Sequence, residues 1–275
     1  MANNKVEIEN NLTSIRSLIA KHKRHDHIFA GVGMFIIISL TITLLILFLD
    51  LVFDGYPRFN LDFLTNFPSR RATAAGILSA WVGSALVLIV TFFAAVPLGI
   101  AAGVYLEEYA KKNWFSDLIE INVTNLAGVP SIIYGLLALG LFVYGFGLGQ
   151  TILTAGLTLA LLMLPIVIVA TREAIRAIPI HIREAAYAVG ATKWQVSLHH
   201  VIQYSYGGIL TGVIIGMARA IGETAPVITI GALTFIAFLP PSPVGLEPPF
   251  INFEWLEAGF TVLPIQMFNW ISRPQ

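Results

Sequence analysis

The chain has 275 residues, of which 56% are hydrophobic and only 12% are charged. A water-soluble domain carries about 25% charged residues, so this composition excludes an ordinary soluble fold and indicates a membrane protein. The 16 Lys and Arg residues balance the 16 Asp and Glu residues, and no basic stripe is present, so we expect no nucleic-acid partner. The absence of cysteine excludes disulfides and thiolate metal sites.

The N-terminal segment, residues 1–27, is polar and precedes the first apolar run. That run is longer than the apolar region of about 7–15 residues in a cleavable signal peptide, so we expect a retained cytoplasmic tail. His22, His25 and His27 lie in this tail beside basic residues. We interpret them as facing lipid headgroups and assign no metal.

The first span is predicted at Ile28–Leu49, which has no charged residue and exceeds the length of about 20 residues that crosses a bilayer. With the external loop that follows, it makes a region at residues 28–73. The next charge-free stretch, Ala72–Leu106, is interpreted as one tilted span bent at Pro97.

Two more spans are predicted between Ile121 and Thr171, joined on the external side by the glycine turn Gly145–Gln150. A fifth begins near Tyr204 and runs to about Ala232, beyond which several prolines forbid a helix. We therefore expect an all-α membrane protein with five visible spans, in which residues 74–275 form one transmembrane domain.

The distribution of positive charge gives the orientation. The tail and the second and fourth connections together hold eleven Lys and Arg residues, whereas the connections on the opposite side hold three. Cytoplasmic loops carry the excess of positive charge. The N-terminus and the fourth connection are therefore expected in the cytoplasm of a multi-pass membrane protein.

The fourth connection, Arg172–Gln203, carries its own local structure signals. Pro179 is expected to end the incoming helix, and the alanine-rich stretch His181–Val189 favours a short helix. Gly190 suits a left-handed helix end, and Thr192–Gln195 fits the capping box of a second short helix.

This connection resembles the cytoplasmic signature of binding-protein-dependent ABC importer permeases, carried here by Glu184, Ala185, Ala186 and Gly190. The end of the signature differs, because residues 200–203 lack its proline. The resemblance implies the transmembrane domain of a type I ABC importer (MetI-like), with a coupling helix at about residues 181–199 that docks on an ATP-hydrolysing subunit. The alternative is a hairpin that only caps the bundle.

The sequence has no Gly-rich nucleotide-binding loop ending in Gly-Lys-Ser/Thr. ATP would therefore have to be hydrolysed by a partner, and we expect no catalytic residues and no cofactor in this chain.

The fifth span contains an ionisable pair, Arg219 and Glu223, followed by Thr224 and Pro226. The two charged residues are four apart and are expected on one helix face, while Pro226 removes a backbone hydrogen bond to Gly222. An arginine in the bilayer centre costs at least about 2.5–3.5 kcal/mol and is functional by default. We assign Arg219, Glu223 and Thr224 to a solute path; the alternative is a self-neutralising pair buried for packing.

Three segments make the resemblance to a permease family more specific: Leu106–Ala110, Asn125–Gly135 and Ala218–Pro226. They are similar to segments of PstA-type permeases of phosphate ABC importers, and the similarity extends from about Ala75 to the end of the chain. It implies a permease subunit in the cell (inner) membrane that imports inorganic phosphate. The implied partners are a second homologous permease chain, a dimer of cytoplasmic ATP-binding subunits and an extracytoplasmic phosphate-binding protein.

The residues alone leave alternatives open. A guanidinium fork suits phosphate oxygens, and Arg219 with Glu223 would make a transient gate, but a fork also binds another oxyanion such as sulfate. A membrane scaffold or sensor that moves no solute is a further alternative. Arg172 and Arg176 are interpreted either as an exit for the anion or as an ordinary positive collar.

Permeases of this type have a sixth span that returns the chain to the cytoplasm. The segment Trp255–Ile271 contains Glu257 and Pro264 and is a poor crossing helix. We therefore expect the sixth, C-terminal span to be missing from this sequence.

Overall fold

A computed structural model describes residues 2–69, 71, 74–111, 113–233, 236–244 and 250–272; within the first 25 residues it describes only the side chain of Lys23. The described residues are mainly helical and contain no strand longer than one bridge, between Val244 and Ile251. They form two compact units, residues 1–60 and 61–275. The predicted all-α fold is confirmed, while His22 and His25 lie outside the described side chains.

The first unit is one helix, α1 (Ala2–Gly55), followed by the short turn η1 (Tyr56–Arg58). The part from Asp26 to Arg58 is long and apolar enough to cross a membrane, with a mean hydropathy of 2.8. Its described leucine, isoleucine and phenylalanine side chains are exposed. A helix that is apolar on every side suits lipid as its surroundings, which agrees with the predicted first span.

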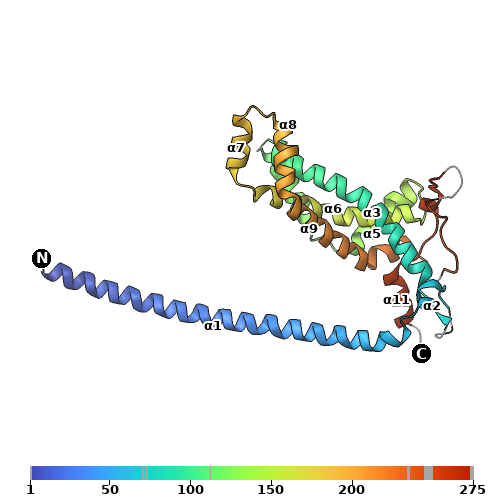
Figure 1. Ribbon diagram of the computed structural model, residues 1–275, viewed down its shortest axis with the longest axis horizontal. Helices are drawn as coiled ribbons and strands as arrows, with labels where there is room; N and C mark the ends of the chain where they lie inside the picture. The colour runs from blue at the N-terminus through green and yellow to red at the C-terminus, as the bar shows by residue number, and fades with distance from the viewer. Residues whose placement is uncertain are drawn as a thin grey trace. The chain divides into compact units, whose positions relative to one another are not determined.

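The second unit is built around three long helices: α3 (Leu78–Val104), α6 (Ile152–Arg176) and α9 (Ile202–Gly222). Helix α6 packs against both of the others and is the most buried (Figure 1). Small residues allow the close approach: Gly99 of α3 lies against Val167, and Gly212 of α9 lies against Ala170. Membrane helices commonly pack through such residues.

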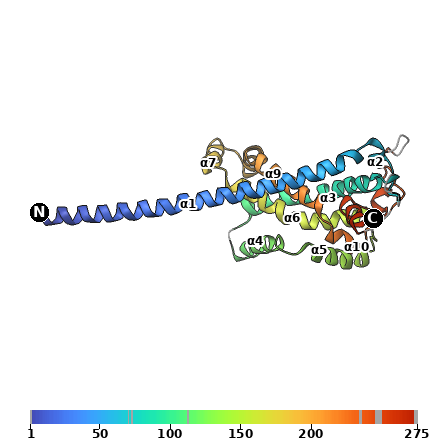
Figure 2. The ribbon, with the colours of Figure 1, turned by 90° about the horizontal axis from the view of Figure 1, so that it is seen from below.

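The expected third span is broken. Helix α4 (Trp114–Leu126) and the continuous pair α5 (Ser131–Ala138) and η4 (Leu139–Gly145) meet at an angle of 104° (Figure 2). The break falls before Pro130, which cannot donate a helical hydrogen bond, and the Tyr134 hydroxyl donates to the carbonyl of Leu126 at 2.7 Å. Among its described residues, the second unit thus has three helices long and apolar enough to cross a membrane, or four if the bent pair is one span.

The fifth span also ends earlier than predicted. Helix α9 stops at Gly222, Glu223 has extended backbone, and Pro226 lies in the first turn of the short helix α10 (Ala225–Ile230). The reason is the missing N–H of Pro226, which a continuous helix would need at this position. Glu223 therefore lies just beyond the helix that carries Arg219, a correction to the expected shared helix face.

One end of the second unit, predicted to be external, holds α2 (Leu61–Thr65), η6 (Glu254–Glu257) and α11 (Leu263–Ile271). Phe260, Val262 and Ile265 are buried there in one apolar cluster with residues of α3 and α6. Helix α11 has nine residues and is about 14 Å long, too short to cross a bilayer, as expected for this segment.

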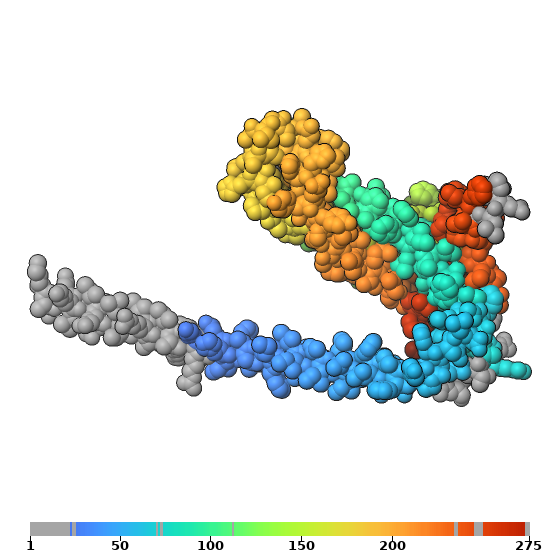
Figure 3. All heavy atoms as spheres, in the orientation of Figure 1, coloured from blue at the N-terminus to red at the C-terminus, as the bar shows by residue number. Residues whose placement is uncertain are grey.

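At the opposite end of the second unit, α7 (Ile180–Ala188), α8 (Lys193–Val196) and the π-helical turn η5 (Ser197–Val201) project from the bundle (Figure 3). We call α7 and α8 the cytoplasmic element, after the side of the membrane that the sequence predicts for them. Pro179 is the residue before α7, Gly190 has a φ of +87°, and Thr192 and Gln195 form a capping box. All three local predictions are confirmed.

Candidate functional site

The Arg219 and Glu223 side chains form an ion pair at the break between α9 and α10. The Nε atom of Arg219 lies 3.2 Å from Oε1 of Glu223. The Arg219 side chain is 42% exposed and that of Glu223 is 16% exposed. The pair therefore exists as predicted, but the guanidinium is open to its surroundings and is not enclosed in the protein core.

Behind Glu223 lies a small cavity between α3, α6, α9 and α10, lined mostly by apolar side chains. Its volume of about 10 Å³ is close to what a single water molecule needs. Ser84 also lines it, and its hydroxyl accepts a hydrogen bond from the Leu263 amide at 2.9 Å. The cavity is too small to hold a phosphate ion.

Thr224 adjoins the pair through the backbone. It is partly buried and precedes α10, where its carbonyl accepts a hydrogen bond from the Ile228 amide at 3.0 Å. No contact of the Thr224 hydroxyl with Arg219 is recorded in the described part of the chain. Sequence reasoning placed Thr224 beside the charges, and the structure brings it there only by its position in the chain.

Helix α10 also brings together two of the three segments that resemble PstA-type permeases, Asn125–Gly135 and Ala218–Pro226. Helices α5 and α10 lie near each other (Figure 2). Gly135 of α5 packs so closely on Pro226 and Thr229 that a side chain at this position would clash with both. The bend before Pro130 and the break after Gly222 therefore belong to one packed region. Interrupted helices at membrane depth are tolerated where they are buried in protein or line a cavity.

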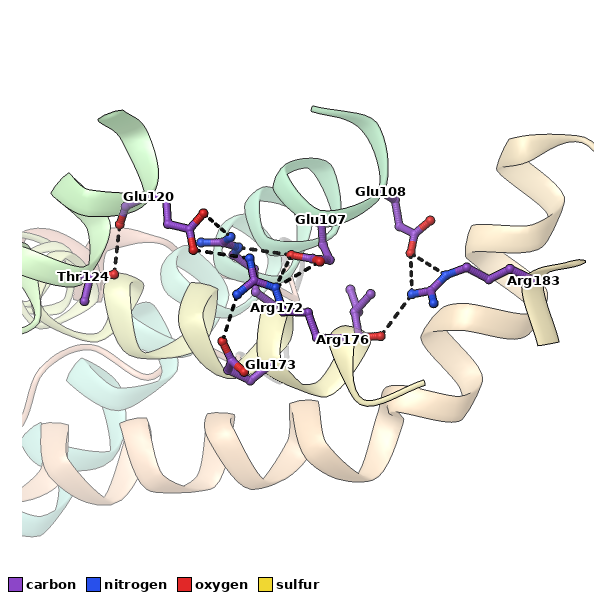
Figure 4. Close-up of polar contacts among 9 residues, drawn as sticks. Glu107, Glu108, Glu120, Thr124, Arg172, Glu173, Arg176 and Arg183 are labelled. Carbon is purple, nitrogen blue, oxygen red and sulfur yellow. Dashed lines mark hydrogen bonds and ion pairs between the residues drawn. The ribbon is translucent and has the colours of Figure 1, made fainter. Parts of the chain in front are cut away.

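A second group of charged residues gathers at the cytoplasmic end of the bundle, and sequence reasoning did not find it. Its carboxylates come from α4, α6 and the π-helical turn η3 (Tyr105–Tyr109), and its guanidinium groups come from α6 and α7 (Figure 4). We call it the cytoplasmic cluster; it consists of Glu107, Glu108, Glu120, Arg172, Glu173, Arg176 and Arg183.

Arg172 is the most buried arginine of the cytoplasmic cluster, with a side chain only 7% exposed. Its Nη2 atom lies 2.7 Å from Glu120, and its Nε atom lies 3.5 Å from Glu107. Arg176 donates from Nε to both oxygens of Glu107, at 3.0 and 3.1 Å. Both arginines are thus occupied by carboxylates of other elements and do not form an open anion exit in this arrangement.

The four signature residues of the cytoplasmic element divide into two groups. Ala186 is buried against Ile175, Ile178 and other residues of an apolar cluster, whereas Glu184, Ala185 and Gly190 are exposed. The interior position of Ala186 means that it positions α7 and cannot contact a partner directly.

Sequence reasoning missed the exposed large side chains on the same element, Tyr187, Val189 and Trp194. They flank the signature in the sequence, but an apolar residue near the membrane does not by itself distinguish a docking surface from a lipid-facing one. Among the residues whose side chains are described, no group of histidine and carboxylate side chains is placed to hold a metal ion.

Comparison with known proteins agrees with this architecture. Residues 95–244, more than half of the chain, match the family described as binding-protein-dependent transport system inner membrane component. The chain is 32% identical over 224 residues to the probable ABC transporter permease protein YqgI of Bacillus subtilis, covering 81% of this chain and 71% of that protein.

Two relatives carry a more specific name. The chain is 35% identical to the phosphate transport system permease protein PstA of Mycobacterium leprae over 202 residues, covering 74% of this chain but only 62% of that protein. It is 30% identical to the protein of the same name from Haemophilus influenzae over 244 residues, covering 87% and 84% of the two chains. The chain belongs to the family of binding-protein-dependent transport system inner membrane components.

Proposed function

We propose that this chain is a permease subunit of an ATP-driven importer of inorganic phosphate in the cell (inner) membrane. The observation that carries the proposal is the half-exposed guanidinium of Arg219 at a helix break, inside a segment that resembles phosphate permeases. The names of the relatives support phosphate as the solute. The crossing helices of the second unit support a role within the membrane.

In this proposal Arg219 is a transient binding group for the anion. Among the described residues, only its Nε atom donates a hydrogen bond, to Glu223. Its Nη donors are then available to phosphate oxygens, which suit the planar guanidinium fork. The Glu223 carboxylate competes for the same guanidinium and limits how tightly an anion is held. The residues of the pair, with Thr224 beside them, therefore act as a gate.

The cytoplasmic element is proposed to receive the energy of ATP hydrolysis from a dimer of separate ATP-binding subunits. Glu184, Ala185 and Gly190 present exposed, small or charged groups for docking, and Tyr187 and Trp194 extend that surface. Aromatic residues are enriched at protein interfaces. This chain itself is not an enzyme, because its role is transport.

The transport complex would also need partners outside this chain. A second homologous permease chain would cover the exposed side of Arg219 and complete the solute path. An extracytoplasmic phosphate-binding protein would deliver the anion to it.

The test is labelled-phosphate uptake and ATP hydrolysis measured together in vesicles that hold the whole transporter. Arg219→Gln is expected to abolish uptake while the complex assembles and hydrolyses ATP, because the charge that receives the anion is lost. Thr211→Ala is a matched control on the same helix, since the Thr211 side chain is exposed and its hydroxyl bonds only to the Gly207 carbonyl of its own helix. Unchanged uptake in Arg219→Gln would show that the pair is structural.

A competition experiment with sulfate tests the other anion that fits a guanidinium fork. An excess of unlabelled sulfate is expected to leave phosphate uptake unchanged, whereas unlabelled phosphate should compete fully. Competition by sulfate would make the chain a permease of broader oxyanion specificity.

A further inference from the structure

One member of the cytoplasmic cluster links the cytoplasmic element to the end of a spanning helix. Arg183 of α7 donates to Oε1 of Glu108 from Nη2 at 2.9 Å and from Nε at 3.2 Å (Figure 4). The Glu108 side chain is 7% exposed and that of Arg183 is 16% exposed. This is the most enclosed ion pair among the residues described.

The same guanidinium also reaches the end of α6. Its Nη2 atom donates to the carbonyl of Ile175 at 3.0 Å, and its Nη1 atom donates to the carbonyl of Ile178 at 3.2 Å. Carbonyl groups at helix ends have few helical partners, and Arg183 donates to two in this region, of which that of Ile175 also accepts from the Ile178 amide at 3.2 Å. One side chain thus connects α7, the end of α6 and the π-helical turn η3, which continues α3.

A neighbouring contact strengthens the link through the second short helix. The Nζ atom of Lys193 in α8 lies 4.9 Å from the ring centre of Tyr109, the last residue of η3. A cation over an aromatic face is attracted to it. Both helices of the cytoplasmic element therefore contact η3 by charged side chains.

The turn η3 connects the cytoplasmic element to two of the long helices. Tyr105–Tyr109 is π-helical and directly continues α3, and such turns occur often at functional sites. Within five residues it presents Glu107 to α6 and Glu108 to α7. A displacement of α7 would be passed by this turn to two long helices at once.

We propose that the Glu108–Arg183 pair makes the cytoplasmic element move as one body with the ends of α3 and α6. Arg183 is then a positioning residue that couples ATP hydrolysis in a partner to solute movement through this chain. The proposal rests on the proposed function for its transport readout. Its physical basis is that an enclosed ion pair with further hydrogen bonds holds one geometry, because losing either partner leaves a buried charge unpaired.

The direct test is Glu108→Gln in the whole transporter, with labelled-phosphate uptake and ATP hydrolysis measured in the same vesicles. We expect the phosphate transported per ATP hydrolysed to fall about tenfold, within the range typical of coupling between sites, while hydrolysis continues. A role in folding alone would lower both rates in proportion to the amount of assembled complex. Asp117→Asn is the matched control, because Asp117 is an exposed carboxylate near the same end of the bundle.

A covalent link in place of the ion pair tests whether coupling between ATP hydrolysis and transport can be restored. The chain has no cysteine, so in Glu108→Cys/Arg183→Cys a bismaleimide can react in this chain only with the two introduced thiols. We expect the double variant to be uncoupled before treatment and to regain transport per ATP after cross-linking. Each single-cysteine variant, treated in the same way, should remain uncoupled.

The outcomes separate this inference from the proposed function. One outcome is that the unaltered transporter imports phosphate while Glu108→Gln keeps the same ratio of phosphate transported to ATP hydrolysed. In that case the proposed role of the Glu108–Arg183 pair is wrong and the proposed function stands. If the unaltered transporter imports no phosphate, amide hydrogen exchange in the assembled complex still tests whether the Glu108–Arg183 pair holds α7 in place. Glu108→Gln is then expected to speed amide exchange across Ile180–Ala188 and not in the middle of α9. An unchanged exchange rate in α7 would overturn the proposed role of the Glu108–Arg183 pair.

Discussion

The pair in the membrane and the cytoplasmic cluster use the same two kinds of side chain in opposite ways. Arg219 has one carboxylate partner, a single hydrogen bond at 3.2 Å and a half-exposed guanidinium at a helix break. Arg172 and Arg183 are enclosed, and their carboxylate partners come from elements far away in the sequence. A group that exchanges partners must remain accessible, whereas a group that holds helices together is enclosed.

Removing the most enclosed charge should have the largest effect on stability. Arg172→Ala removes the buried guanidinium that pairs with Glu107 and Glu120 and leaves both carboxylates to the more exposed Arg176. Breaking a fully buried pair costs about 3–5 kcal/mol; because Arg176 remains and the Glu120 side chain is 38% exposed, we expect a cost toward the lower end of this range and less assembled protein. Arg219→Ala should cost less than Arg172→Ala, because the Arg219 guanidinium is 42% exposed and pairs with one carboxylate among the described residues, that of Glu223, which is 16% exposed.

Thermal unfolding of the purified variants in detergent would measure this contrast. Equal losses of thermal stability in Arg172→Ala and Arg219→Ala would remove the distinction between the two regions.

The geometry of the membrane pair can be disturbed without removing its charges. Pro226→Ala restores the N–H that a continuous helix needs and should let α9 extend toward α10. Glu223 would then move onto the helix of Arg219. Because misplacement of a functional group by about 1 Å can cost about a hundredfold, we expect phosphate uptake to fall by up to that factor.

The measurement for Pro226→Ala is uptake in vesicles, with the amount of assembled transporter determined in parallel. Ile228→Val serves as its control in α10, because the Ile228 side chain is exposed and the change removes one methylene without altering the backbone. If Pro226→Ala transports normally, the helix break is not part of the gate.

The turn between α7 and α8 gives a smaller effect confined to the cytoplasmic element. Gly190 has a φ of +87° and no neighbour that a methyl group would meet. Gly190→Ala should therefore cost only the left-handed backbone strain, about 1–2 kcal/mol. Amide exchange should rise across α7 and α8 and remain unchanged in α3; unchanged exchange in both would show that the turn is not strained by a side chain.

These contrasts also show which features a sequence can predict. Pro179, Gly190 and the Thr192–Gln195 capping box act on residues within one turn of the chain, and the structure has each of them as expected. The breaks before Pro130 and Pro226 were harder to place, because a proline bends some membrane helices and ends others. Here packing of Gly135 against Pro226 accompanies both breaks.

The cytoplasmic cluster could not be predicted in the same way. Glu108 and Arg183 are 75 residues apart, and Glu107 and Arg176 are 69 apart. Their charges could be seen at the ends of apolar stretches, but only the packing of α3 against α6 brings them together. For the same reason the sequence indicated the Arg219–Glu223 pair, whose members are four residues apart, and missed the enclosed pairs.

The smallest effect is expected at the exposed edge of the cytoplasmic cluster. Glu173 lies 3.4 Å from Arg176 on the same helix, and its side chain is largely exposed. Such a pair contributes about 0.2–0.5 kcal/mol and is weakened by salt, and Arg176 keeps its two bonds to Glu107. Glu173→Gln should thus change thermal stability by no more than this amount, and the difference should vanish at high salt. A loss as large as that of Arg172→Ala would mean that the cluster acts as one cooperative unit, in which exposure no longer separates strong pairs from weak ones.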